Sequence, residues 1–188
     1  MPELNKTYCG TVCDLTVNGD GVVKIDSYPV FVKSVIPGDE ISFILTVKNK
    51  TYGYGKLKKI IKSSENRRTP ECPSFSGCGG CTLMSLNYGA QLEFKEKLVL
   101  GNLVRIGGCS ESEFEYEPIV GAEKEYHYRN KAQFPVGLKN KKAICGFYAP
   151  KSHDIVPCEN CKIQNDVINL AVAVVMNFLR INKIGLYD

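Results

Sequence analysis

Five of the nine cysteines lie where their spacing suits a metal centre. Cys72, Cys78 and Cys81 fall within ten residues, in a stretch of Gly, Ser and Pro that lets the backbone bend tightly around a bound group. Cys158 and Cys161 form a second pair further along the chain. Thiolates are ligands of structural zinc and of iron–sulfur clusters, so the sequence predicts a thiolate metal centre.

The spacing of these cysteines is compatible with two metals. A zinc site would combine the two Cys-x2-Cys pairs that begin at Cys78 and Cys158, and it would leave Cys72 unused. An iron–sulfur cluster would use Cys72, Cys78 and Cys81 together with one distant cysteine. The residues themselves leave both alternatives open.

The remaining cysteines stand alone in apolar or strand-like surroundings, where small buried side chains are expected; they are Cys9, Cys13, Cys109 and Cys145. The odd total argues against a fully paired disulfide framework. The first residues lack the pattern of an export signal, and every apolar run is far shorter than the roughly 17–25 residues of a membrane span. We therefore expect a cytoplasmic protein with reduced thiols and no membrane partner.

Basic residues are concentrated in the segment 48–68, which holds eight Lys and Arg against one acid, although the net charge of the chain is only +4. Two tyrosines interrupt this segment. Cations neutralise phosphates and aromatic rings stack on bases, and single-stranded RNA binding requires both. The predicted RNA contacts in this segment are Lys48, Lys50, Tyr52, Tyr54, Lys56, Lys58, Lys59, Arg67 and Arg68. The alternative interpretation is a solvated, lysine-rich strand.

A second mixture of basic and aromatic residues occurs over 128–153. The RNA contacts predicted there are Arg129, Lys131, Phe147 and His153. A strand with locally satisfied polar groups over 128–131 is the alternative, and a histidine such as His153 more often makes a local hydrogen bond than a base contact. Neither histidine has a partner at metal-ligand spacing.

Short strands separated by turns are predicted over 8–61, where Gly and Pro recur between alternating apolar residues. We expect strands at 11–17, 22–25, 30–35 and 40–47, with a turn at Pro37-Gly38. This pattern indicates a small antiparallel barrel or sandwich, and a five-stranded barrel fits the length.

The second half of the chain predicts helices as well as strands. A polar linker at 63–69 precedes the cysteine loop, and a helix over 87–106 is ended by Gly107-Gly108. Strands are expected at 131–136 and 143–148, and a helix with an apolar stripe over 166–181.

The predicted fold class is therefore α+β. The expected parts are an N-terminal five-stranded OB-like β-barrel at 1–62, a linker with the cysteine loop at 63–86, and a mixed α/β central domain at 87–188. The central domain would contain a helix, antiparallel strands and a C-terminal helix.

Two sets of motifs resemble known families. Three stretches resemble the TRAM domain, a small RNA-binding barrel: Asn18-Gly-Asp-Gly-Val-Val, Pro29-Val-Phe-Val-Lys33 and Ile36-Pro-Gly-Asp-Glu40. Nearly the whole chain resembles the 23S rRNA uracil-5 methyltransferase family, in which the following motifs occur in the same order: Cys72-x5-Cys78-Gly-Gly-Cys81, Tyr88-x2-Gln91-Leu92-x2-Lys95, Tyr128-Arg-Asn-Lys131, Gly146-Phe-Tyr148, Ser152-His-Asp-Ile-Val156 and Cys161-x-Ile-Gln164.

This resemblance implies that the metal centre is a 4Fe-4S cluster. Its ligands would be Cys72, Cys78, Cys81 and Cys161, with Cys158 outside the family's pattern. Four thiolates close the coordination shell, so we expect a structural role for the cluster.

The resemblance also implies RNA, in particular 23S rRNA, as the partner. Methyl transfer to uracil would use S-adenosylmethionine bound in a domain that follows these residues in the family. No residue of the chain is predicted to be catalytic, and no turn typical of S-adenosylmethionine binding is recognised. The chain, interpreted as an N-terminal fragment without the methyltransferase domain, is expected to be an inactive monomer.

Two other functions remain compatible with the residues. A free-standing RNA-binding protein would carry the four-cysteine zinc site instead of a cluster. A redox-sensing or iron-sensing protein would use the cluster as a switch.

Overall fold

The computed structural model describes residues 2–186, which form two compact units. Unit 1 comprises the residues up to Thr69 together with Thr82–Gly121, and unit 2 comprises Pro70–Cys81 together with the residues from Ala122 onward. The predicted ranges 1–62, 63–86 and 87–188 divide the chain differently. The structure groups the first long helix with the barrel and the cysteine loop with the residues after Gly121.

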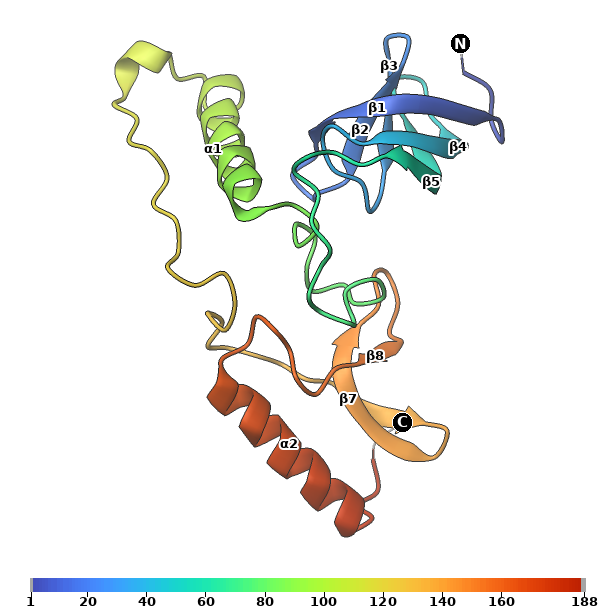
Figure 1. The fold of residues 1–188 in the computed structure, drawn as a ribbon, viewed down its shortest axis with the longest axis vertical. Helices are drawn as coiled ribbons and strands as arrows, with labels where there is room; N and C mark the ends of the chain where they lie inside the picture. Colours follow the sequence, from blue (N-terminus) through green and yellow to red (C-terminus); the bar gives the residue numbers. More distant parts are fainter. Residues whose placement is uncertain (1, 187–188) are drawn as a thin grey trace. The chain divides into compact units, whose positions relative to one another are not determined.

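Unit 1 contains a closed five-stranded barrel (Figure 1). Its strands are β1 (Thr7–Leu15), β2 (Gly21–Ile25), β3 (Tyr28–Val32), β4 (Glu40–Lys48) and β5 (Gly53–Lys62). They follow the order β1-β2-β3-β5-β4, and all pairs are antiparallel except β3 with β5. The predicted α+β class with a five-stranded barrel is thus confirmed.

Apolar side chains that alternate with outward-facing ones along the strands fill the interior of the barrel. The buried core consists of Val12, Val23, Val30, Val32, Val35, Ile41, Phe43 and Leu45. Side chains of a strand point alternately to its two faces, and β3 and β4 accordingly contribute alternate residues to this core. The strand predicted at 30–35 ends earlier, at Val32, because Ser34 adopts a left-handed backbone with φ 63° that an extended strand does not accommodate.

A buried ion pair fastens the polar segment 63–69 to the barrel. Asp39 follows the predicted Pro37-Gly38 turn, which closes with a hydrogen bond from the Asp39 N–H to the Ile36 carbonyl at 3.1 Å. The Asp39 side chain is 0% exposed and accepts from Arg67 through both Nε, at 3.0 Å, and Nη2, at 2.5 Å. It also accepts from the backbone N–H of Ser64 at 3.0 Å. The segment predicted as a linker is therefore packed against the barrel at this point.

Helix α1 (Tyr88–Arg105) packs against a second, smaller hydrophobic core of unit 1, formed by Leu15, Ile36 and Leu86. Asn87 caps its first turn by accepting from the Ala90 N–H at 2.8 Å, and the predicted stop occurs at Gly107-Gly108, where Gly108 has φ 71°. Ala90 and Phe94 pack against buried residues of the barrel and of the segment before α1. This packing explains why α1 clusters with the barrel, although none of its residues is fully buried.

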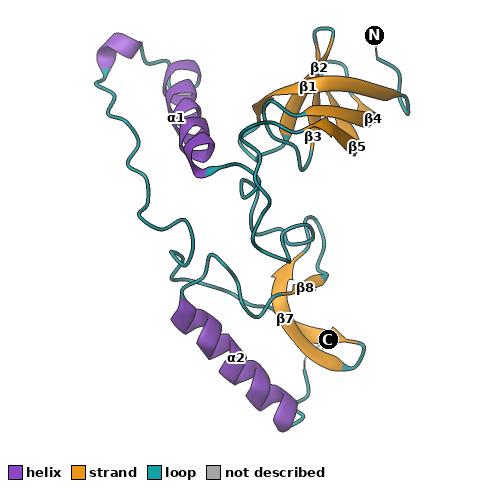
Figure 2. Ribbon diagram, viewed as in Figure 1, coloured by secondary structure: helices purple, strands orange, loops and turns teal. Residues whose placement is uncertain are grey.

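Unit 2 contains a three-stranded antiparallel sheet and one long helix (Figure 2). The strands are β6 (Val136–Lys139), β7 (Lys142–Tyr148) and β8 (Ile155–Pro157), and they pair in that order. The strand predicted at 131–136 is wrong: only Val136 is in a strand, since Pro135 has no N–H to donate to a ladder. The short 3-10 turn η1 (Glu111–Glu113) lies in unit 1.

Helix α2 (Asp166–Ile181) matches the predicted helix and lies along β7 (Figure 1). Met176 is its buried apolar anchor. Much of the predicted stripe is exposed instead, namely Val167, Leu170, Val174 and Phe178. Val175 and Ile181 of the same helix are exposed as well. Across residues 2–186, no helix is long and apolar enough to cross a membrane.

Candidate metal centre and nucleic-acid interface

The cysteine loop folds through a series of tight backbone turns. The N–H of Phe75 donates to the Cys72 carbonyl at 3.1 Å, and that of Cys78 donates to the Ser74 carbonyl at 2.8 Å. The Ser74 hydroxyl donates to the carbonyl of Pro157 at 3.1 Å, which ties the loop to the end of β8. These bonds bring the loop beside the segment that carries Cys158 and Cys161.

Five thiols gather at this place in unit 2. Cys78 and Cys81 each interact electrostatically with Cys72 and Cys161, and Cys158 shares a hydrogen bond with Cys161. Burial, together with the neighbouring thiols, raises the pKa of Cys81 to about 11. Nevertheless, no group of three or more His, Cys, Asp or Glu side chains within residues 2–186 is already arranged around a metal position.

The surroundings shift the pKa values of Cys158 and Cys161 in opposite directions. The hydrogen bond from Cys158 lowers the pKa of Cys161, and backbone N–H groups of Ile163 and Gln164 lower it further against the opposing effect of burial. The same hydrogen bond and burial raise the pKa of Cys158. The surroundings therefore favour a thiolate at Cys161 and a protonated thiol at Cys158.

Asn169 positions Cys161, and sequence reasoning missed it. Its side-chain oxygen accepts from the Cys161 N–H at 3.0 Å, and its side-chain nitrogen donates to the Cys161 carbonyl at 3.1 Å. Asn169 is buried on the inner face of α2. The only sequence signal was a polar residue inside an apolar helical segment, which needs a hydrogen-bond partner when buried.

The donor set fits a cluster held by thiolates. The Gly80 N–H donates to Cys78 Sγ at 3.3 Å, and the amides near Cys161 point to its sulfur. Hydrogen bonds to ligand sulfurs are one means by which proteins tune iron–sulfur centres.

Three aromatic rings form a surface cluster on the barrel. The ring centroids of Phe31 and Tyr52 lie 5.7 Å apart, those of Phe31 and Tyr54 also 5.7 Å, and those of Tyr52 and Tyr54 5.8 Å. Phe31 was missed, although its place between the inward Val30 and Val32 indicated an outward ring. We call Phe31, Tyr52 and Tyr54 the barrel aromatic cluster.

Basic side chains continue from this cluster along β5. Tyr54, Lys56 and Lys58 alternate with inward residues and are exposed. Gly55 faces inward, and a Cβ added there would lie 2.7 Å from the Phe43 ring. Glycine at this position therefore leaves room for Phe43, while the neighbouring Tyr54 and Lys56 point outward. Lys48, Lys50 and Lys59 are exposed as well.

The two predicted arginine contacts of this segment are engaged in the fold. The guanidinium of Arg67 is 17% exposed and binds Asp39. The Nε of Arg68 donates to the Met84 carbonyl at 3.2 Å. As RNA contacts both stay predictions, and the structure gives each of them a local bonding role.

Of the predicted contacts in unit 2, Phe147 and His153 line one hollow, whereas Arg129 and Lys131 are not part of its lining. Arg129 is exposed and lies near enough to Cys81 and Cys161 to interact with them electrostatically. Phe147 packs on Phe134 with ring centroids 4.7 Å apart, and His153, in the turn between β7 and β8, packs on Tyr148.

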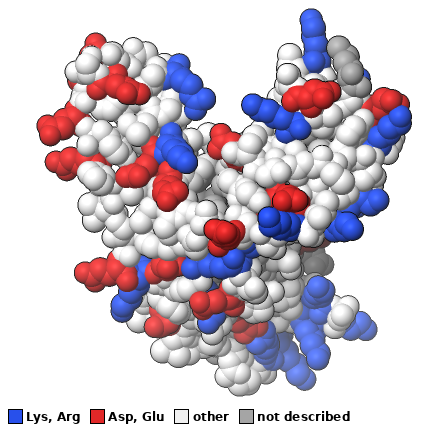
Figure 3. Space-filling view, turned by 45° about the horizontal axis from the view of Figure 1, so that its top comes forward, with Lys and Arg blue, Asp and Glu red and all other residues white. Residues whose placement is uncertain are grey.

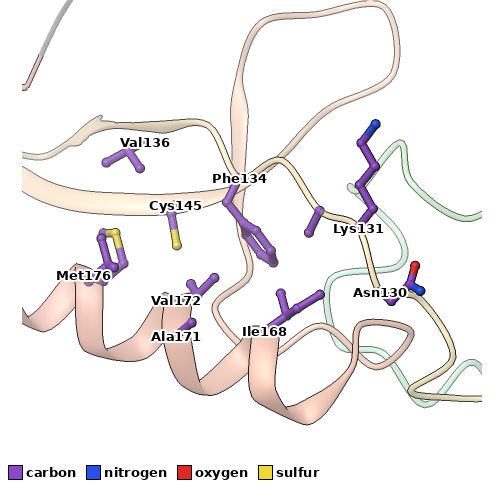
Figure 4. A pocket seen from close by; sticks show the side chains of 11 residues that line it. Asn130, Lys131, Phe134, Val136, Cys145, Ile168, Ala171, Val172 and Met176 are labelled. Atoms are coloured by element: carbon purple, nitrogen blue, oxygen red, sulfur yellow. The ribbon is translucent and has the colours of Figure 1, made fainter.

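An apolar pocket of about 510 Å³ lies between α2 and the β6–β7 hairpin (Figure 4). Figure 4 shows the Cys145 thiol pointing toward α2 between Val172 and Met176, with Lys131 at the edge. Burial raises the pKa of Cys145 to about 11. Its thiol therefore stays protonated near neutral pH, which does not favour a nucleophilic role.

Charges are unevenly distributed over the surface. Acidic residues dominate 111–125, and Figure 3 shows acidic side chains gathered on the left of that view. Basic side chains gather at its lower right, and the β6–β7 hairpin carries Lys139, Lys141 and Lys142.

No protein-family model matches the chain. A Clostridium tetani protein named uncharacterized RNA methyltransferase is 36% identical over 184 residues, which are 98% of this chain and 39% of that protein. A Listeria innocua protein of the same description is 41% identical over 162 residues, covering 86% of this chain and 35% of that protein. The chain thus spans less than two fifths of the length of these relatives.

A solved structure matches as well. The tRNA (uracil-54, C5)-methyltransferase of Pyrococcus abyssi, in complex with S-adenosyl-L-homocysteine, superposes with a TM-score of 0.62 at 28% identity. The match covers 95% of this chain and 38% of the other. Along nearly its whole length, the chain is therefore a homologue of RNA methyltransferases, with the fold of part of a uracil-5 methyltransferase.

Proposed function

We propose that this chain is the RNA-binding portion of an S-adenosylmethionine-dependent RNA uracil-5 methyltransferase. The observation that carries the proposal is the outward face of the barrel, where the barrel aromatic cluster adjoins Lys56 and Lys58 on β5. Rings and cations on one small barrel supply stacking and phosphate neutralisation for single-stranded RNA. The relationship to RNA methyltransferases supports RNA as the partner of this surface.

A charge-reversal experiment tests this surface. The variant Lys56→Glu/Lys58→Glu is compared with Lys95→Glu/Lys97→Glu, which reverses two exposed lysines on α1. We expect the β5 variant to weaken binding to a single-stranded RNA and to reduce the salt slope by about 0.7 for each lost phosphate contact. If both variants bind as the parent does, the β5 face is not the RNA-binding surface.

We propose 23S rRNA as the substrate of the whole protein. The family resemblance of the cysteine motifs supports this choice, whereas the name of the Pyrococcus abyssi neighbour favours tRNA as the second candidate. Competition between rRNA fragments and tRNA for the full-length relative, with 5-methyluridine mapped in each product, distinguishes the two.

We further propose that Cys72, Cys78, Cys81 and Cys161 hold a 4Fe-4S cluster. The gathering of these thiols, the N–H groups directed at Cys78 and Cys161, and the thiolate-favouring surroundings of Cys161 support it. When bound, the cluster supplies a rigid link between the cysteine loop and the segment before α2. The protein's own part is to orient these thiols.

Metal analysis after anaerobic purification tests the cluster. About four irons per chain are expected, and Cys72→Ser should abolish iron binding while Cys158→Ser retains it. A single zinc that survives Cys72→Ser would instead identify a site made from the two Cys-x2-Cys pairs. That result would overturn the cluster assignment.

Methyl transfer is proposed to need residues outside these 188. The support is that the chain spans only 35–39% of the matched relatives. Incubation with labelled S-adenosylmethionine and RNA should give no labelled product with this chain and product with a full-length relative. Label transferred by the 188-residue chain would refute this division of roles.

A further inference from the structure

A second hollow in unit 2 is formed where the cysteine loop meets the β7–β8 turn. It has a volume of about 550 Å³ and is lined by Gly79 and Gly80 on one side and by 147–153 on the other. Sites for small ligands commonly have volumes of about 300–1,000 Å³. The hollow therefore has room for a group as large as a nucleobase with its sugar.

The lining suits a flat ring with a negative charge beside it. The rings of Tyr148 and His153 stand at 80° to each other with centroids 5.5 Å apart, and Tyr148 is 47% exposed. Lys151 is exposed on the same turn and supplies a cation. Aromatic faces and a cation together match the chemistry of a nucleotide.

The turn that carries these side chains is held by its own hydrogen bonds. The Ala149 N–H donates to the Asp154 carbonyl at 2.9 Å, and the Ser152 hydroxyl donates to the Asp154 carboxylate at 2.7 Å. Ordered walls reduce the entropy lost when a ligand binds.

The cysteine loop provides the opposite wall at close range. The Gly79 N–H donates to the Tyr148 carbonyl at 3.1 Å, and a Cβ added at Gly79 would lie 2.9 Å from that same oxygen. Glycine is thus required for this approach. The loop that carries Cys78 and Cys81 also sets the width of the hollow.

We propose that this hollow receives one unstacked nucleobase of single-stranded RNA, with the base against Tyr148 and His153 and an adjacent phosphate near Lys151. The inference rests on the proposed RNA-binding function and names a second contact point, separate from the barrel. RNA proteins commonly bind splayed bases on aromatic side chains in this manner.

Binding of a labelled single-stranded RNA of about 16 nucleotides tests the proposal. Tyr148→Ala should weaken binding roughly 5- to 150-fold, the range expected for the loss of one base–aromatic stack. Tyr148→Phe should retain binding, because it keeps the ring. Tyr116→Ala, at a tyrosine 39% exposed in unit 1, is the matched control and should leave binding unchanged.

Photo-crosslinking with 4-thiouridine in the same RNA gives an independent readout. Crosslinks within 147–153 are expected in the parent chain and should disappear in Tyr148→Ala. If Tyr148→Ala binds like the Tyr116→Ala control and no crosslink falls in 147–153, the nucleobase site is wrong. The β5 charge-reversal variant then tests the proposed function separately. A protein that binds RNA only through the barrel loses RNA affinity in that variant, whereas a protein without an RNA function shows no RNA binding even in the parent chain.

Discussion

Replacement of Asp39 by Asn should destabilise the barrel by about 3–5 kcal/mol. The carboxylate is completely buried and accepts from two backbone N–H groups, those of Ile36 at 2.8 Å and Ser64 at 3.0 Å, as well as from Arg67. An amide keeps the size of the side chain but offers one acceptor oxygen and leaves the guanidinium without its counter-charge. Breaking a buried ion pair on one side typically costs this amount.

An adjacent exposed pair provides the control. Glu40 lies 3.7 Å from Lys62, with side chains 48% and 76% exposed, so Glu40→Gln should cost no more than about 1 kcal/mol. Urea unfolding followed by far-ultraviolet circular dichroism measures both changes. An Arg67→Met/Asp39→Asn double variant should lose less than the sum of the single changes, because each single change strands the other partner.

The pH dependence gives the same pair a second test. Burial alone would raise the pKa of Asp39, but the hydrogen bonds from Arg67, Ser64 and Ile36 outweigh it and hold the pKa below the ordinary 3.8. The stability that this group contributes is present above about pH 4 and is lost as the pH falls through the lower folded-state pKa. Asp39→Asn should therefore flatten the acid limb of the stability curve. If Asp39→Asn and Glu40→Gln lower the free energy of unfolding equally at pH 7, Arg67 is not a structural partner of Asp39.

Three further outcomes are expected. Gly146→Ala should destabilise unit 2 by about 1–3 kcal/mol or more in urea unfolding, because the added Cβ would lie 1.9 Å from the Val156 carbonyl oxygen in the β7–β8 pair. Asn169→Ala should cost about 1–3 kcal/mol and accelerate amide exchange at Cys161, since it leaves the buried Cys161 N–H without its acceptor, while the Cys161 carbonyl keeps the bond from the Gln164 N–H; unchanged exchange would contradict the positioning role. Iodoacetamide at pH 7.5 should label the exposed cysteines of β1 well before Cys145, whose pKa burial raises to about 11, and mass spectrometry of the peptides checks the order.

The barrel was predictable because its strands alternate and its turns have distinct residues. Pro37-Gly38 marked a real turn, and the alternation around Val30 and Val32 located the core. The end of β3 was not predictable, since nothing in the composition of 30–35 shows that Ser34 takes a left-handed backbone. Sequence patterns report which face a residue prefers more reliably than where a strand stops.

The sequence predicted the cysteines that the fold brings near one another, whose metal binding stays a prediction, but it did not predict the side chains around them. The spacing of Cys72, Cys78 and Cys81 marked the loop, but the partner of Cys161, Asn169, acts through a contact that exists only after α2 has packed. Arg67 illustrates the converse, because a positive charge in a basic segment looks the same in sequence whether it meets a phosphate or a buried carboxylate.

Unit 2 is assembled from two stretches of chain, and this affects how it forms during synthesis. The cysteine loop leaves the ribosome first, whereas Cys161 follows 80 residues after Cys81. At about 5–20 residues per second, that interval lasts about 4–16 s. The barrel strands are complete before the interval begins, so the nascent chain carries a foldable barrel beside three uncovered thiols. Oxidative damage to this loop should therefore depend on translation speed as well as on the stability of the finished protein.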